Sequence, residues 1–332
     1  MSDIKLFRLQ AGQATELQGD ASDLEKPLQT LIERNLDTLL GIRFLASEYA
    51  TGKTHGGRID SLGLDENDCP VILEYKRSVG ENVINQGLFY LDWLMDHQAE
   101  FKLLVMETLG KAAADQIDWS APRLVCIAAD FTKYDGHAVQ QINRNIELIR
   151  YRRFGEDLLL LELANTASAG SAKSMKGSKV VKPVKAADEG AVLGKAGGTD
   201  KTVAEQLAAM PEPLAVLLAS LEDYVLSLGD DVQRKELKLY IAFKRLKNFA
   251  TVVPQKGRLL LYLHLDVDQI TPPPGIGRDV RQQGHWGTGD MELSLTKAAD
   301  LDLVKPLILQ AYEGRAAAST MPALPPTPPT TP

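Results

Sequence analysis

The stretch Gly56–Arg77, with the sequence GGRIDSLGLDENDCPVILEYKR, contains two runs of strand-forming residues joined by a turn. The runs are Arg58–Leu64 and Pro70–Tyr75, and the segment between them begins with the turn-rich residues Asp65–Asp68 (DEND). Short apolar runs on both sides of a turn-rich segment are typical of a β-hairpin. We therefore predict two adjacent strands in this stretch.

This hairpin carries three ionisable side chains, Asp60, Glu74 and Lys76, among apolar neighbours. Side chains two positions apart in a strand share a face, so Glu74 and Lys76 project together, and the hairpin can bring Asp60 to the same point. Two converging carboxylates suit a hard cation such as Mg²⁺, and an ammonium group beside them can orient a bound water. A surface Glu–Lys pair on an edge strand is the alternative that these residues leave open.

Helical and strand-like patterns alternate on both sides of the hairpin. A capping-box pattern at Ser22 and Glu25 predicts the start of the first helix, and Gly41 predicts its end. The further elements expected are a helix over 20–41, a helix over 82–98, strands over 101–106 and 123–128, a helix over 138–150 and a strand over 157–163. This alternation indicates an α/β domain built on a mixed sheet flanked by helices.

Composition divides the chain into five segments. The segment after the α/β domain is rich in Ala, Gly, Ser and Lys, which is typical of a flexible basic linker, and the Pro-rich end cannot form a core. A smaller α+β domain is expected between them. The predicted segments are 1–19, an N-terminal segment; 20–163, the α/β domain; 164–201, the linker; 202–315, the α+β domain; and 316–332, a disordered tail.

The bulk properties are those of a soluble protein. The chain has 332 residues and a formal net charge of −7. No apolar run approaches the roughly 20 residues that a membrane span needs, so we expect no membrane partner and a cytoplasmic location. Because local charge decides nucleic-acid binding, the negative total does not exclude it.

The hairpin and the helix after it resemble the core of PD-(D/E)XK nucleases. Asp60 corresponds to the first acidic residue, and Glu74–Lys76 (EYK) to the (D/E)XK element. The run Gln86–Tyr90 (QGLFY) is similar to the Q-x-x-x-Y motif of the RecB-type branch, and the order of the elements is similar to that in NucS and its relatives. Ile59 stands where the nominal proline would be. The resemblance implies a restriction-endonuclease-like fold over residues 20–163.

The resemblance also implies chemistry. Asp60 and Glu74 would bind Mg²⁺ or Mn²⁺, Lys76 would assist the attacking water, and Gln86 and Tyr90 would orient the site. Glu33, on the first helix, matches a further metal-binding glutamate of many such nucleases, and an exposed helix glutamate is its alternative. The implied activity is hydrolysis of nucleic-acid phosphodiester bonds, with DNA favoured over RNA.

Basic residues outside this core are candidates for contact with phosphates. They are Arg58, Arg77, Arg150, Arg152, Arg153, Lys244 and Lys247. For the group near Arg150 the alternative is an ordinary charged helix end. In the second domain Phe243 and Phe249 could stack on bases, but we expect both side chains to lie in the hydrophobic core. For the glycine-rich loop at 284–290 the expected reading is a turn with Trp286 packed inward, and a recognition loop is the alternative.

Two further functions remain open besides the nuclease. The chain could be a non-catalytic nucleic-acid-binding protein that kept the fold, or an interaction protein whose second half binds another protein. The second half resembles an uncharacterised domain of so-called predicted transport proteins, although nothing in the sequence supports transport. A homodimer is also left open.

Overall fold

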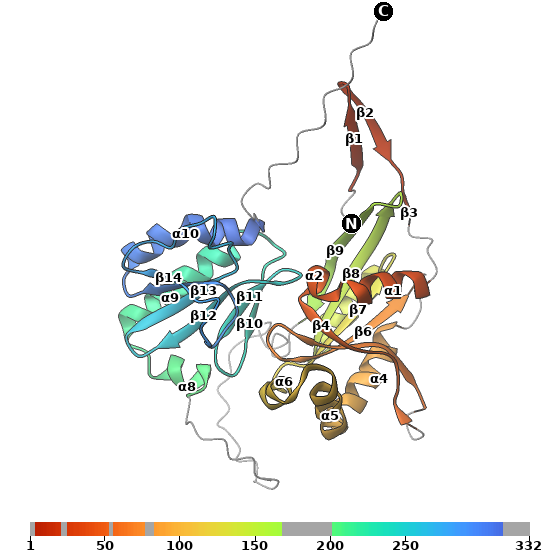
Figure 1. Cartoon of the computed structure of the whole chain (residues 1–332), viewed down its shortest axis with the longest axis horizontal. Helices are drawn as coiled ribbons and strands as arrows, with labels where there is room; N and C mark the ends of the chain where they lie inside the picture. Colours follow the sequence, from red (N-terminus) through yellow and green to blue (C-terminus); the bar gives the residue numbers. More distant parts are fainter. Residues whose placement is uncertain (1–3, 21–24, 53–55, 77–82, 168–200, 315–332) are drawn as a thin grey trace, which may run out of the picture. The chain divides into compact units, whose positions relative to one another are not determined.

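The computed structural model describes residues 4–20, 25–52, 56–76, 83–167 and 201–314. The chain divides into two compact units, Met1–Asp200 and Lys201–Pro332 (Figure 1). Each unit has its own hydrophobic core and is treated by itself. Within the described residues no helix is long and apolar enough to cross a membrane.

A mixed sheet forms the centre of the first unit. Its strands are β3 (Gly19–Asp20), β4 (Ile42–Ala50), β5 (Arg58–Asp65), β6 (Pro70–Lys76), β7 (Arg123–Ala128), β8 (Asn145–Phe154) and β9 (Leu158–Ala167). Their order is β3-β8-β7-β6-β5-β4, with β9 paired to β8. Strands β6, β7 and β8 run parallel, whereas the other pairs are antiparallel. A separate hairpin is formed by β1 (Leu6–Gln10) and β2 (Gln13–Leu17).

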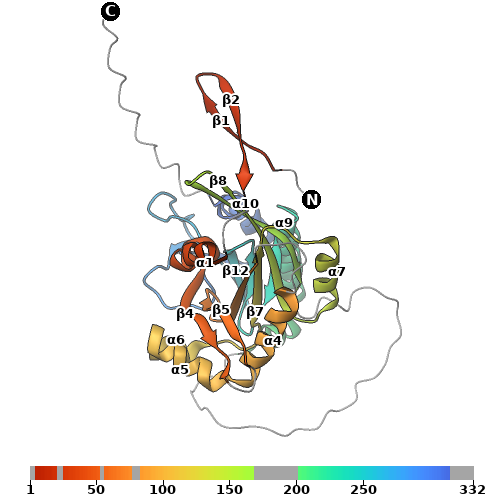
Figure 2. The same ribbon diagram turned by 90° about the vertical axis from the view of Figure 1, so that its right-hand side faces the viewer.

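Helices cover both faces of this sheet. They are α1 (Glu25–Arg34), α2 (Leu36–Leu40), α4 (Val83–Asp96), α5 (Gln98–Leu109), α6 (Lys111–Gln116) and α7 (Lys133–Gln141). Figure 2 shows α1 on one side of the sheet and α4 and α7 on the other. Helix α4 packs on β6 and β7, and α7 packs on β9.

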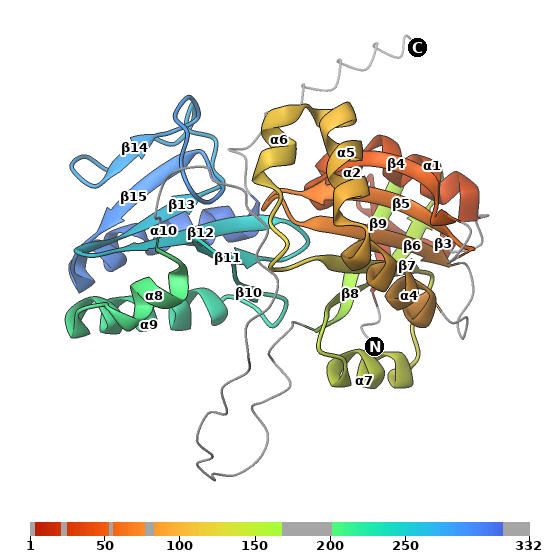
Figure 3. The same cartoon turned by 90° about the horizontal axis from the view of Figure 1, so that it is seen from below.

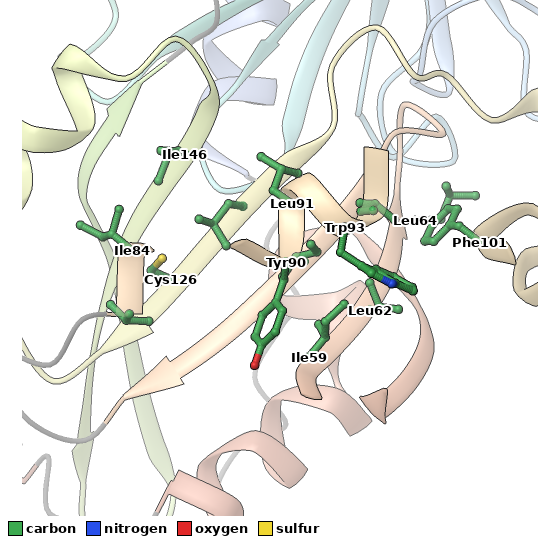
Figure 4. Packing of buried hydrophobic residues seen from close by; sticks show 14 of the residues in the cluster. Ile59, Leu62, Leu64, Ile84, Tyr90, Leu91, Trp93, Phe101, Cys126 and Ile146 are labelled. Atoms are coloured by element: carbon green, nitrogen blue, oxygen red, sulfur yellow. The ribbon is translucent and has the colours of Figure 1, made fainter. Parts of the chain in front are cut away.

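Helix α4 is anchored by large buried side chains. Trp93 and Leu94 are buried in the same cluster as Ile59 and Leu62 of β5 (Figure 4). Gly87 permits the close approach, because a Cβ atom there would lie 2.4 Å from Leu124 Cδ1. The helix that carries Gln86 and Tyr90 is therefore held firmly against the strands that carry the candidate site.

The second unit is an antiparallel sheet covered on one face by helices, as Figure 3 shows. Its helices are α8 (Val203–Ala208), α9 (Glu212–Leu226) and α10 (Ala298–Glu313). Its strands are β10 (Gln233–Glu236), β11 (Ile241–Lys244), β12 (Asn248–Gln255), β13 (Arg258–Leu263), β14 (Gly277–Asp279) and β15 (Met291–Leu295), in the order β10-β11-β12-β13-β15-β14. The predicted fold class, an α/β unit followed by a smaller α+β unit, is confirmed.

Two of the predicted elements are wrong. The run 101–106 is part of helix α5, where only Phe101 and Val105 are buried, at helical spacing. The predicted helix 138–150 is in fact the end of α7 followed by strand β8. Helix α7 begins earlier because Thr132 and Asp135 form a capping box.

The first predicted helix is divided into α1 and α2, and Gly41 ends the second with a φ of 64°. The predicted cap at Ser22 lies outside the described residues, as do the predicted linker from residue 168 to 200 and the tail from residue 315. Strand β9 extends to Ala167, beyond the predicted end at residue 163.

Candidate active site

The candidate site lies where the β5–β6 ladder stops being regular. Backbone pairing extends from Leu64 opposite Pro70 to Ser61 opposite Leu73. One step further on, side chains take over from the backbone. Asp60 Oδ2 accepts a hydrogen bond from the Tyr75 N–H at 2.9 Å, and Glu74 Oε1 accepts one from the Asp60 N–H at 3.3 Å. The two carboxylates are therefore brought together by opposite positions on neighbouring strands.

Glu74 is buried in an environment that disfavours its negative charge. Burial, followed by the neighbouring Asp60 carboxylate, raises the pKa of Glu74 to about 9, and a side-chain hydrogen bond with Asp60 acts in the same direction. Glu74 Oε2 is buried without a hydrogen-bond partner among the described residues. A buried carboxylate oxygen of this kind is costly unless a proton or a cation compensates it.

Lys76 follows Glu74 at the end of β6 and is half-buried. It lies close enough to Glu74 for its positive charge to lower the pKa of that carboxyl group, against the larger effects of burial and Asp60. Two-residue spacing in a strand places both side chains on the same face. The structure thus brings Asp60, Glu74 and Lys76 together, as the hairpin pattern predicts.

Gln86 and Tyr90 lie one turn apart on α4, and their side chains meet. Gln86 Nε2 donates to the Tyr90 hydroxyl at 3.4 Å, and this hydroxyl accepts the Arg58 N–H at 3.1 Å. Arg58 is two residues before Asp60 on β5. Figure 4 shows the Tyr90 side chain extending from α4 beside Ile59. The Tyr90 hydroxyl therefore contacts the strand that positions Asp60.

Glu33, on α1, is attached to the neighbours of the two carboxylates. Its Oε1 accepts hydrogen bonds from the Ser61 hydroxyl at 2.6 Å and from Gln29 Nε2 at 2.9 Å. Gln29 Nε2 also donates to the Asp60 carbonyl oxygen at 2.7 Å. Gln29 and Ser61 thus support the site, although no sequence motif singles them out.

The donor set fits a cation held mainly by two carboxylates. In the described part of the chain, no group of three or more His, Cys, Asp or Glu side chains is arranged to hold a metal ion, and Glu33 does not complete such a group. Mg²⁺ commonly binds through one or two carboxylates and takes its remaining ligands from water and substrate phosphates. Asp60 and the buried Glu74 Oε2 are consistent with that kind of site.

The candidate phosphate-contacting residues are scattered. Arg58 is exposed, with its Nη1 3.7 Å from Glu48 Oε2, and Arg77 lies outside the described residues. Arg150 is buried, and its guanidinium pairs with Asp130 and Glu162, each at 2.7 Å. Arg152 and Arg153 are half-buried and lie on strand β8 instead of at a helix end.

The second unit does not present the expected basic and aromatic residues on one surface. Phe243 and Phe249 are buried in its core, as expected for most aromatics, and Lys244 is buried as well. Lys247 is exposed. Trp286 is 51% exposed, so the expectation that it packs inward is wrong.

Comparisons with known proteins match both parts of the chain. Residues 203–314 match the family described as a domain of unknown function, DUF5655. A Haemophilus influenzae protein, itself described as uncharacterized, is 28% identical over 321 residues, which cover 93% of this chain and 100% of that protein. A solved structure titled as an EndoMS complex with double-stranded DNA is 20% identical, with a TM-score of 0.23. That match covers 41% of this chain and 47% of the solved one.

Proposed function

We propose that the first unit is a metal-dependent nuclease that hydrolyses phosphodiester bonds, with DNA as the favoured substrate. The observation that carries the proposal is the meeting of Asp60 and Glu74 at the irregular end of the β5–β6 ladder. A buried Glu74 carboxyl group beside a half-buried Asp60 and a lysine is a costly arrangement for the fold alone, and perturbed groups of this kind gather at functional sites. The preference for DNA rests on the motif order shared with NucS-type nucleases.

In this proposal Asp60, Glu74 and Lys76 have different roles. Asp60 and Glu74 would hold Mg²⁺ or Mn²⁺, and the unpartnered Glu74 Oε2 is the oxygen that gains most from a cation. When bound, the cation would lower the pKa of a water molecule and stabilise negative charge on the phosphate. The Lys76 ammonium would orient that water or neutralise developing charge from its place beside Glu74.

Gln86 and Tyr90 support the same site from α4. The Tyr90 hydroxyl holds the backbone at Arg58, and Gln86 holds that hydroxyl. Gln29, on α1, also holds this strand, because its Nε2 donates a hydrogen bond to the Asp60 carbonyl oxygen. Both contacts fix the backbone around Asp60, so in this proposal these residues position the first carboxylate.

The experiment that tests the function is a cleavage assay with the whole chain. Labelled single-stranded, duplex and branched DNA, together with matched RNA, are incubated with Mn²⁺, with Mg²⁺ and with a chelator. The proposal expects cleavage of at least one DNA substrate that requires the metal. Absence of cleavage on every substrate in both metals would contradict it.

The second candidate is a nucleic-acid-binding protein without catalysis. Its specific support is that the described residues provide two carboxylates but no larger ligand group. Under this alternative the chain binds DNA with a strong salt dependence, because neutralised phosphates release counterions, yet it cleaves nothing. Measuring binding and cleavage on the same oligonucleotides separates the two functions.

A further inference from the structure

A second polar site lies on the same face of the sheet as Glu74 and Lys76. Lys76 pairs with Ala128 on β7, Ala128 with Arg150 on β8, and Arg150 with Glu162 on β9. Paired residues in a sheet project to the same face, and Lys76 and Arg150 are two strand spacings apart, or about 10 Å. Arg150 therefore lies near the candidate active site. The pairing of the strands does not by itself put Arg150 in contact with Lys76.

A cleft of about 400 Å³ opens at Arg150, between α7 and strands β8 and β9. Its apolar lining residues include Phe131 and the fully buried Leu148. Polar groups from Arg150, Glu162 and His137 form another part of the lining. The volume is near the lower end of the usual range for small-molecule pockets, roughly 300–1,000 Å³.

The charges in the cleft favour a neutral polar occupant. The guanidinium of Arg150 is held by Asp130 and Glu162, both at 2.7 Å. The side chain of Arg150 is only 10% exposed, so Arg150, Asp130 and Glu162 form a largely buried charge cluster instead of an exposed ion pair. The two carboxylates offset the charges of Arg150 and of Lys133, which also lines the cleft, so little attraction is left for a phosphate. A nucleobase, by contrast, offers an apolar face and a polar edge.

The cleft and the candidate active site also open at the same edge of the sheet. Strands β6 and β7 are parallel, and they end at Lys76 and Ala128. Asp130 and the capped start of α7 follow immediately after β7. Ligands of open α/β sheets bind outside the carboxyl ends of such strands. A strand held at Lys76 thus has the cleft beside it.

We propose that this cleft receives one unstacked nucleoside of the nucleic-acid strand whose phosphate is held at Asp60 and Glu74. The inference rests on the proposed function for the position of that strand. The base would contact Phe131 with its face and the Arg150–Glu162 pair with its edge. Such a subsite selects substrates with an unpaired or easily unstacked nucleotide, because unstacking a paired base costs a few kcal/mol.

The test fills the cleft from an exposed position. His137 is exposed on α7 and lines the cleft, so His137→Trp places a large side chain in it. Ala138→Trp is the matched control, because Ala138 is the next residue on α7, is exposed and is not part of the lining. Single-stranded oligonucleotides that carry 2-aminopurine at successive positions are titrated with the whole chain in Ca²⁺, and the fluorescence increase reports unstacking.

The expected result is an increase at one position with the wild-type chain and Ala138→Trp. With His137→Trp the increase is lost and binding is about tenfold weaker, on the scale of one lost base contact. No position-specific increase, or an equal increase with His137→Trp, would overturn the inference. The cleavage assay is run in parallel on the same oligonucleotides. Cleavage without the fluorescence increase leaves the nuclease standing and rejects the cleft, whereas the increase without cleavage rejects only the nuclease.

Discussion

Glu74 Oε1 lies 3.3 Å from the backbone nitrogen of Asp60, while Asp60 Oδ2 lies 2.9 Å from the backbone nitrogen of Tyr75. Each residue's carboxylate thus accepts a hydrogen bond from the other strand's backbone where a regular ladder would use a carbonyl oxygen. This exchange places two carboxyl groups at one point and leaves Glu74 Oε2 without a hydrogen-bond partner in the described part of the chain. The stability of the site should therefore respond to protons and to cations.

The metal-free chain should lose stability as the pH rises. The pKa of Glu74 is raised from 4.5 to about 9 in the folded chain, so the folded state holds this proton more tightly than the unfolded state. The contribution is full below about pH 4.5 and is lost as the pH approaches 9. Urea unfolding in EDTA across this range should show the decrease for the wild-type chain and a smaller one for Glu74→Gln. Identical pH profiles for both chains would contradict this prediction.

Divalent cations should stabilise the first unit through the same carboxylates. A ligand at 100 times its dissociation constant adds about 2.7 kcal/mol, so Mn²⁺ should raise the melting temperature of the wild-type chain by several degrees. Asp60→Asn, which keeps the side-chain shape, should remove most of this increase. Asp37→Asn, at an exposed position on α2, is the control and should keep it. An undiminished increase in Asp60→Asn would show that the cation binds elsewhere.

Removal of the Tyr90 hydroxyl should loosen the strand before Asp60. Tyr90→Phe loses the hydrogen bond from the Arg58 N–H and leaves that donor without its acceptor, which costs about 1–2 kcal/mol of unfolding free energy. The control is Tyr134→Phe, because Tyr134 is 71% exposed on α7. Urea denaturation followed by circular dichroism measures both. Equal stability of the two variants would mean that the Tyr90 contact does not support the strand.

Residues close in sequence account for the parts of the fold and site that could be predicted. Strand β7 coincides with the predicted run 123–128, because an uninterrupted apolar segment suits a strand buried on both faces. The run 101–106 is equally apolar but helical, and so short a run does not distinguish the two structures. The start of α7 could have been predicted more accurately. Thr132 and Asp135 form a capping box, and this sequence signal places the helix start before residue 138.

The same distinction holds at the candidate site. Asp60, Glu74 and Lys76 follow from strand spacing across a short hairpin. Gln29 contacts the Asp60 carbonyl oxygen from 31 residues away, and such a contact depends on how α1 packs on the sheet. The burial of Arg150 likewise depends on its partners Asp130 and Glu162, which lie on other elements. Sequence patterns within one helix or strand do not predict these long-range pairings.

The most direct test of the central claim compares the cleavage rates of Glu74→Gln and Glu107→Gln with that of the wild-type chain. Glu107 is exposed on α5 and takes no part in the site, so its variant controls for the loss of one carboxylate. Initial rates are measured on labelled DNA in Mn²⁺, with DNA binding measured on the same samples. The account predicts that Glu74→Gln cleaves at least a hundredfold more slowly while still binding DNA, because most binding energy comes from phosphate contacts elsewhere. It also predicts that Glu107→Gln matches the wild-type chain. Cleavage by Glu74→Gln at the wild-type rate would contradict the assignment of the active site to Asp60 and Glu74.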